Sequence, residues 1–198
     1  MLITFEGIDG CGKTTQLKLV AEMLESRGFK VHSLREPGGT DVSEAIREIL
    51  LSSKSKLNDI TELLLFESAR SNLVESIIKP ALAKGDYVLC DRFFDSTTAY
   101  QGYGRQIDLN VIQNCNEIAT GGLKPNLTFY LRLSLQESKK RAGSREKDRI
   151  EKAGDNFFLR VIKGFDEIAA NEPERVKIID ASGGIDETKI EIFKHISI

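Results

Sequence analysis

Residues Gly7 to Thr14, near the start of the chain, match the pattern G-x-x-x-x-G-K-[ST]. A glycine-rich turn of this kind lets backbone N–H groups point at one anion, and a helix beginning there adds its partial positive charge. In such a loop Lys13 reaches the β- and γ-phosphates of a nucleotide, and the Thr14 hydroxyl ligates Mg²⁺. A flexible glycine turn without a ligand is the less favoured alternative. The residues predicted to surround the phosphates are Gly7, Ile8, Asp9, Gly10, Cys11, Gly12, Lys13, Thr14 and Thr15.

A second group of chemically capable residues begins at Asp91, which directly follows the apolar run 87–90. A carboxylate at the end of a buried strand is the expected ligand for Mg²⁺, and Arg92 beside it can bind a phosphate through paired hydrogen bonds. Hydroxyl and amide side chains over 96–103 suit a sugar or a base. A surface ion pair is the alternative. Asp180 also ends an apolar run, but no arginine follows it, so Asp91 is favoured as the metal ligand.

Three arginines at positions 141, 145 and 149 have the spacing i, i+4 and i+8, which places them on one face if the segment is helical. Such a face could close over a transferring phosphoryl group and stabilise its charge. A solvated charged surface is the alternative. The phosphate-binding loop favours the first interpretation, a lid.

Two further features indicate where a second substrate would bind. Phe66 and Arg70 lie one turn apart on a predicted helix, a spacing that suits a base and a phosphate, although Phe66 alone is more typical of the core. Asp9 is a carboxylate inside a phosphate-binding loop, so we expect its side chain to point toward the acceptor or its metal. Neither histidine has a partner in the sequence pattern that would indicate a base. None is needed if the acceptor is a monophosphate, whose oxygen is already anionic.

The elements that position these residues alternate between strand and helix. Apolar runs predict strands at 2–5, 29–34, 87–91, 127–133 and 176–179. Helical periodicity is found at 16–27, 41–51, 58–79, 110–120, 156–171 and 186–195. Pro80 is expected to break the third helix, and a short helical stretch after it is expected to end at Gly85. Residues 92–105 are interpreted as a loop, and 135–149 as short helical pieces. This order predicts an α/β fold with a five-stranded parallel sheet, helices on both faces, and ligands at the carboxyl ends of the strands.

Composition limits the class of protein. A chain of 198 residues with 40% apolar and 29% charged residues fits one α/β domain, predicted over 1–198 with a lid at about 139–152. The net charge of −2 implies no bulk attraction to nucleic acid. The three cysteines are widely spaced and favour a reducing compartment. No apolar run is long enough for a membrane span, and the first strand leaves no room for a signal peptide, so a cytoplasmic location is expected.

Together these motifs resemble thymidylate kinases, the nucleoside monophosphate kinases that convert dTMP to dTDP. The resemblance covers nearly the whole chain and is carried by four segments: Phe5–Thr15, Arg35–Thr40, Asp91–Arg105 and Asp148–Val161. The segment Asp91–Arg105 is the most specific of the four. The resemblance implies a P-loop NTPase fold of the nucleoside monophosphate kinase type, ATP and Mg²⁺, a transferase activity in nucleotide biosynthesis, and a homodimer.

The resemblance also implies roles for individual residues in binding dTMP. Asp9 would contact the 3′-hydroxyl, Phe66 would stack on thymine, and Arg70 would hydrogen-bond the base. Arg92 would hold the phosphate, and Pro37 would line the thymine pocket. Ser96, Thr97, Tyr100 and Gln101 would surround the base and the sugar.

The catalytic group implied by the resemblance is that of the bacterial-type enzymes, in which the lid supplies the arginines and the P-loop has none. It consists of Lys13, Asp9, Arg92, Arg141, Arg145 and Arg149, with Thr14 and Asp91 at the metal.

Three alternatives to dTMP phosphorylation are considered. A deoxynucleoside kinase would need a base for a neutral hydroxyl, for which Asp9 is the candidate. Another nucleoside monophosphate kinase would share the same motifs. A switch ATPase or GTPase belongs to a different class, but the N-K-x-D motif of GTPases is missing from the sequence.

Overall fold

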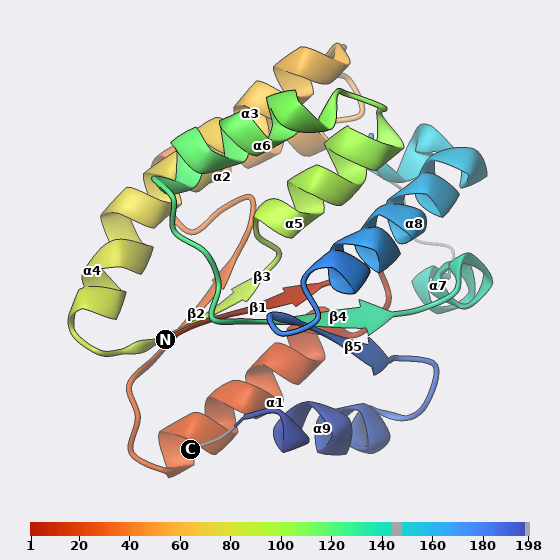
Figure 1. The fold of residues 1–198 in the computed structure, drawn as a ribbon. Helices are drawn as coiled ribbons and strands as arrows, with labels where there is room; N and C mark the ends of the chain where they lie inside the picture. Colours follow the sequence, from red (N-terminus) through yellow and green to blue (C-terminus); the bar gives the residue numbers. More distant parts are fainter. Residues whose placement is uncertain (144–147, 197–198) are drawn as a thin grey trace.

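The computed structural model describes residues 1–143 and 148–196 (Figure 1). Its strands are β1 (Leu2–Glu6), β2 (Val31–Arg35), β3 (Tyr87–Asp91), β4 (Leu127–Arg132) and β5 (Val176–Asp180). Its α-helices are α1 (Lys13–Ser26), α2 (Asp41–Leu51), α3 (Asp59–Leu73), α4 (Lys79–Ala83), α5 (Phe94–Thr97), α6 (Leu109–Thr120), α7 (Leu135–Ala142), α8 (Asp155–Asn171) and α9 (Ile185–Lys194). Two π-helical segments, η1 (Val74–Ile78) and η2 (Thr98–Gly104), and a short 3₁₀ turn, η3 (Glu151–Ala153), complete the described elements.

The strands form one parallel sheet in the order β2-β3-β1-β4-β5, which confirms the predicted sheet. Strand β1 is buried along its whole length and pairs with β3 on one side and β4 on the other. The register sets Phe5 opposite Asp91, so the loop after β1 and the turn after β3 leave the sheet side by side. This edge carries the carboxyl ends of the strands, where ligands of such sheets bind.

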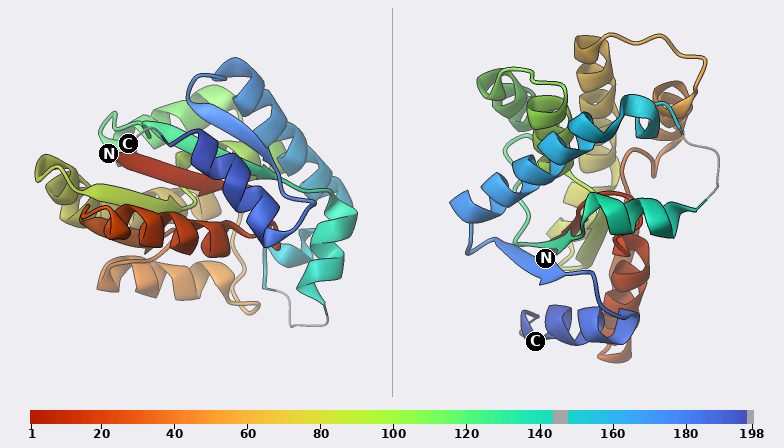
Figure 2. Two further views of the ribbon diagram at one scale, coloured as in Figure 1. Left: turned by 90° about the horizontal axis from the view of Figure 1, so that it is seen from below. Right: turned by 90° about the vertical axis from the view of Figure 1, so that its right-hand side faces the viewer.

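Helices cover both faces of the sheet (Figures 1 and 2). Helices α1 and α9 pack together on one face, over a core that includes Phe5, Leu24 and Ile192. The other face carries α3, α5, α6 and α8, with one core around Tyr130 and Phe165 and a second around Leu2 and Val88. The alternation of inward side chains along each strand supplies both faces with apolar groups.

Several helices begin and end where their local sequence dictates. Thr40 caps α2 by accepting a hydrogen bond from the backbone N–H of Ser43, and Asn58 caps α3 in the same way through the N–H of Thr61. Gly121 adopts a left-handed conformation at the end of α6. These signals explain why the predicted bounds of α2 agree with the structure, why α3 begins within one residue of its predicted start, and why α6 ends at its predicted residue. The predicted helix over 58–79 ends as an α-helix at Leu73 and continues as η1.

The prediction of a loop over 92–105 is wrong. Residues 94–104 form α5 and η2, and η2 packs against α8. Tyr100 reaches the rings of Phe157 and Phe165, with centroids 6.0 and 6.2 Å away. The serine, threonine and glycine content suggested a loop, but tertiary packing against an apolar helix overrides local propensity.

The short helical stretch predicted after Pro80 is present as α4, but Pro80 does not break the helical region. It lies in the first turn of α4, directly after η1, where a backbone N–H would have no partner within α4 in any case. The wide turn of η1, in which the N–H of Lys79 donates to the carbonyl of Val74, carries the chain into α4.

No helix among the described residues is both long and apolar enough to cross a membrane.

Candidate active site

The loop between β1 and α1 is shaped for an anion. Gly7 has a φ of 134°, and a Cβ there would lie 2.6 Å from the carbonyl oxygen of Leu131, so only glycine fits. Gly12 stands at the N-cap of α1 in a left-handed conformation, and no side chain caps this helix. The first N–H groups of α1 therefore remain available to a ligand. The side chains of Ile8 and Cys11 point into the core instead and anchor the loop.

Lys13 lies at the centre of this loop and is nearly buried. Its Nζ donates to the carbonyl oxygens of Gly7 and Ile8, each 3.1 Å away. The ammonium group is therefore held inside the curve of the loop, where the phosphates of a nucleotide would accept its hydrogen bonds.

Thr14 and Asp91 meet where a metal ligand pair is predicted. The Thr14 hydroxyl donates to Oδ2 of Asp91 across 2.6 Å. Hydroxyl and carboxylate oxygens are the ligands that Mg²⁺ prefers, and this ion usually keeps waters and substrate phosphates as its other ligands. The pair fits that chemistry. Over 1–143 and 148–196, no cluster of three or more His, Cys, Asp and Glu residues forms a metal site built from protein side chains alone.

A cavity of about 800 Å³, its open mouth included, lies in front of the loop. It is lined by Asp9, Gly10, Gly12, Lys13, Thr14, Thr15, Arg35, Glu36, Arg47, Asp91 and Arg92. We call it the loop cavity.

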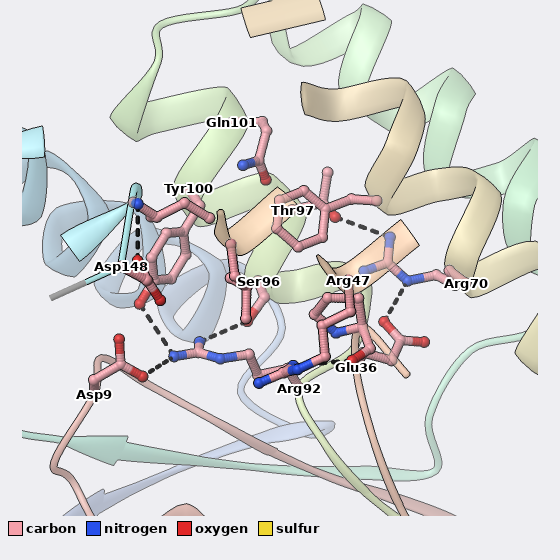
Figure 3. Close-up of a pocket in the computed structure, with 14 residues that line it drawn as sticks. Asp9, Glu36, Arg47, Arg70, Arg92, Ser96, Thr97, Tyr100, Gln101 and Asp148 are labelled. Atoms are coloured by element: carbon pink, nitrogen blue, oxygen red, sulfur yellow. Dashed lines mark hydrogen bonds and ion pairs between the residues drawn. The ribbon is translucent and has the colours of Figure 1, made fainter. Parts of the chain in front are cut away.

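A second cavity, of about 610 Å³ with its mouth, adjoins the first (Figure 3). We call it the acceptor cavity. Every residue with a predicted dTMP contact lines it: Asp9, Pro37, Phe66, Arg70, Arg92, Ser96, Thr97, Tyr100 and Gln101. Glu36, Arg47, Leu51, Asp148 and Ile150 complete its wall.

The two cavities share a wall made of Asp9, Glu36, Arg47 and Arg92. Arg47 was missed by the sequence reasoning; its guanidinium donates to the carbonyl of Pro37 at 2.9 Å. The only signal for it in the sequence is a basic residue within an amphipathic helix, which by itself predicts a solvated face. The shared wall places two arginines and two carboxylate residues where a group could pass between two ligands.

Arg92 is the most heavily bonded residue of this wall. Its backbone has a φ of 72°, unusual for a residue with a side chain. Nη2 donates to Oδ1 of Asp9 at 2.8 Å and to the Tyr100 hydroxyl at 3.2 Å, while Nη1 donates to Ser96 and to the carbonyl of Gly7 (Figure 3). These bonds fix the plane of the guanidinium at the junction of the cavities.

Glu6, which no sequence motif singled out, holds the turn that carries Arg92. This residue ends β1 and is fully buried; its carboxylate accepts from the backbone N–H of Phe93 at 2.7 Å and from the Ser96 hydroxyl at 2.6 Å. Burial, together with the nearby carboxylate of Asp95, raises the pKa of Glu6 to about 8. Glu6 therefore stabilises the left-handed backbone at Arg92 by bonding the residue that follows it.

The far end of the acceptor cavity contains Phe66 and Arg70 from α3. Arg70 is buried and donates through Nε to Glu36 at 2.8 Å and through Nη1 to Thr97 at 2.8 Å (Figure 3). Burial raises the pKa of Glu36 to about 7, against the opposing charge of Arg70. Burial also raises the pKa of Tyr100, so its hydroxyl remains a neutral hydrogen-bond donor and acceptor.

Arg141 and Arg149 of the predicted lid do not share a helical face, because α7 ends at Ala142. Arg141 lies by the loop, where its Nη1 is 3.4 Å from the carbonyl oxygen of Gly10. Arg145 lies outside the described residues. Arg149 lines neither cavity; its guanidinium pairs with Glu62 at 2.6 Å and donates to the carbonyl of Leu50 at 3.0 Å.

Comparisons with known proteins identify the family of this chain. The family model for thymidylate kinase matches residues 5–192. A thymidylate kinase of Prosthecochloris aestuarii is 50% identical over 92% of this chain and 86% of the relative. One of Chlorobium luteolum is 47% identical over 98% and 95%. A crystal structure of thymidylate kinase from Ehrlichia chaffeensis has a TM-score of 0.79 at 38% identity and covers 98% of this chain and 97% of its own. The chain therefore belongs to the thymidylate kinase family.

Proposed function

We propose that the two adjoining cavities bind the two substrates of this family's reaction, ATP in the loop cavity and dTMP in the acceptor cavity. The reaction is the ATP-dependent phosphorylation of dTMP to dTDP, with Mg²⁺ as cofactor, in nucleotide biosynthesis. The observation that carries the assignment is the shared wall. Arg92 and Asp9 line both cavities, so a phosphate bound at Arg92 faces the end of a nucleotide held by Lys13.

The chemistry that this arrangement supports is direct transfer between phosphates. An oxygen of the dTMP phosphate attacks the γ-phosphorus of ATP, and the bond to the β,γ-bridging oxygen breaks, which releases ADP. The attacking oxygen is already anionic, so the protein supplies position and positive charge rather than a base. Lys13, Arg92 and Arg47 supply that charge. Thr14 and Asp91 would hold Mg²⁺, which neutralises phosphate charge when bound.

The orientation of dTMP follows from the charges of the acceptor cavity. Its phosphate would lie at Arg92 and Arg47, and its base would lie between Phe66 and Arg70. Asp9, which accepts from Arg92 at 2.8 Å, would then lie beside the sugar. We therefore propose that Asp9 orients both the acceptor sugar and the arginine that holds its phosphate.

The assignment is tested by incubating the purified protein with ATP, Mg²⁺ and each of dTMP, dUMP, dCMP and thymidine. We expect dTDP and ADP in equal amounts from dTMP and no turnover of thymidine. Turnover of thymidine alone would indicate a deoxynucleoside kinase, and equal turnover of dCMP would indicate a less selective monophosphate kinase. ATP hydrolysis without any acceptor would indicate the switch ATPase class.

We propose that residues 139–152 form the lid, with Arg141 as its contact with the loop. The contacts of Arg149 support a structural role instead of the predicted contact with the phosphoryl group, because its guanidinium pairs with Glu62 and donates to the carbonyl of Leu50. These contacts tie the end of the lid segment to α2 and α3.

Arg149→Ala is expected to lower the free energy of unfolding by about 1–3 kcal/mol, because it leaves a buried carboxylate at Glu62 with one cationic partner fewer. Urea denaturation of the two proteins measures the difference. An unchanged unfolding midpoint combined with a large loss of kcat would instead favour direct action of Arg149 on the phosphoryl group.

We propose a homodimer formed through the outer faces of α2, α3 and α6. These helices pack beside one another and expose a group of large aliphatic side chains: Val42, Ile49, Ile60, Leu64, Val111 and Ile118. Ile118 is 81% exposed. A groove between the three helices is lined by several of these residues and by Cys115. Such a concentration of exposed apolar groups is typical of an interface.

The wild-type protein is expected to have about twice the mass of one 22.1 kDa chain in sedimentation or light scattering. The double variant Leu64→Asp/Ile118→Asp should be a monomer, because charges would be buried in the contact. Ile190→Asp is the matched control, since Ile190 is also an exposed isoleucine but lies on α9, across the sheet. A monomeric wild type, or loss of the dimer in the control alone, would contradict this interface.

We further propose a cytoplasmic location and no nucleic-acid partner. The three cysteines are free thiols in the structure, which suits a reducing compartment. The net charge of −2 supplies no general attraction to nucleic acid.

A further inference from the structure

The hydrogen-bond donors of Arg70 divide into two groups. Three of the five N–H donors are bonded within the protein: Nε donates to Glu36 at 2.8 Å, and Nη1 donates to Glu67 at 2.5 Å and to Thr97 at 2.8 Å. In Figure 3 the remaining nitrogen, Nη2, is drawn without a bond and on the cavity side. The guanidinium is planar and rigid, so the bonds behind it determine where Nη2 points.

Two buried carboxylates face this one guanidinium. Glu67 lies on α3 three residues before Arg70 and is 6% exposed. Its Oε2 has no hydrogen-bond partner among the described residues, so the contact of Oε1 with Arg70 is what stabilises this buried charge. Glu36 also keeps one oxygen, Oε1, without a partner. Glu36 and Glu67 therefore each have Arg70 as the partner of their one bonded oxygen.

Arg70 differs from the two arginines of the shared wall in its partners. Arg47 donates to a backbone carbonyl and Arg92 pairs with the partly exposed Asp9, whereas Arg70 pairs with Glu67, which is buried. The charge of Glu67 offsets that of Arg70, so Nη2 remains a hydrogen-bond donor but is a weak anion site. A neutral carbonyl oxygen is the group that such a donor suits. Thymine presents one at its 4-position, where cytosine presents an amino donor.

We propose that Glu67 is a positioning residue for base selection, which fixes the Arg70 guanidinium and offsets its charge so that Nη2 donates to the 4-carbonyl of thymine and disfavours cytosine. The inference rests on the proposed function of the acceptor cavity. Glu67 does not line that cavity, so its effect is transmitted through Arg70 alone. Thr97 bonds the same Nη1 but carries no charge, and so cannot replace Glu67 in offsetting Arg70.

The test compares Glu67→Ala and Glu67→Gln with the wild type in steady-state kinetics for dTMP, dCMP and ATP. In Glu67→Ala, we expect the ratio of kcat/KM for dTMP to that for dCMP to fall by about tenfold or more, mainly through a higher KM for dTMP. The KM for ATP should stay within about twofold. Glu67→Gln keeps an oxygen acceptor for Nη1 but no charge, so it should recover part of the selectivity.

The matched control is Glu75→Gln. Glu67 and Glu75 line the same groove on the proposed dimer face, but Glu75 is exposed and pairs with Lys79 rather than Arg70. The control should keep wild-type selectivity, and all variants should keep the wild-type mass. The inference would be overturned if both Glu67 variants kept a selectivity within about twofold of wild type. It would also be overturned if KM rose equally for ATP and dTMP. Failure of the wild type to phosphorylate dTMP would overturn the proposed function itself.

Discussion

Replacing Lys13 by alanine is expected to lower kcat/KM by about a thousandfold or more, while dTMP binding stays within about threefold of wild type. The ammonium group lies inside the curve of the loop, 3.1 Å from two of its carbonyl oxygens, and no other lysine lines the loop cavity in the described chain. Its loss removes a positive charge at the point where negative charge must be neutralised during transfer. Lys13 does not line the acceptor cavity, so dTMP should still bind.

The measurement combines steady-state kinetics with calorimetric titration of dTMP into each protein. Because Lys13 also bonds the loop carbonyls, a thermal unfolding curve must accompany the kinetics to separate a chemical loss from a disordered loop. Lys18→Ala is the control, since Lys18 is an exposed lysine of the same helix. If Lys13→Ala retained kcat/KM within about tenfold of wild type, the loop cavity would not be the site of phosphoryl transfer.

The sheet and the loop could be predicted from the sequence because their signals are local. An apolar run followed by spaced glycines and a lysine fixes a strand, a turn and a helix within about 25 residues, and β1 and α1 follow that order. The strand-end position of Asp91 predicted a metal ligand, and the register of β1 with β3 sets Asp91 near Thr14, the other predicted ligand. A family resemblance was needed to gather distant residues such as Phe66 and Gln101 around one cavity.

What could not be predicted depends on tertiary packing. The helical state of 94–104 comes from contact with α8, and local propensity contains no information about such a contact. Glu6 lies just after the strand predicted over 2–5, and its role emerges only because the turn after β3 places Phe93 and Ser96 at its carboxyl group. Arg149 had a helical spacing to Arg141, but the helix ends first and Glu62 binds it instead. Spacing along the chain cannot reveal such competing partners.

The complementary variant, Arg92→Ala, is expected to weaken dTMP binding by about a hundredfold while leaving ATP binding within about threefold. Arg92 is anchored before any substrate arrives: Asp9, Ser96, Tyr100 and the carbonyl of Gly7 hold its guanidinium. Binding of a phosphate at this site therefore needs little further ordering of the Arg92 side chain, which reduces the entropic cost of binding. Titration of dTMP, and separately of ATP with Mg²⁺, measures the two affinities.

Arg92→Lys separates charge from geometry. Lysine keeps the positive charge but loses the planar fork, and a single ammonium group cannot bond Asp9, Ser96 and Tyr100 in the same directions. We therefore expect Arg92→Lys to recover less than about a tenth of the dTMP affinity that Arg92→Ala loses. Glu6 holds the left-handed backbone at residue 92 whichever side chain that residue carries, so the comparison reports the side chain alone. Full recovery by lysine would mean that charge alone binds the phosphate. Equal losses of ATP and dTMP affinity in Arg92→Ala would mean that the shared wall serves both nucleotides, and the separate assignment of the two cavities would be wrong.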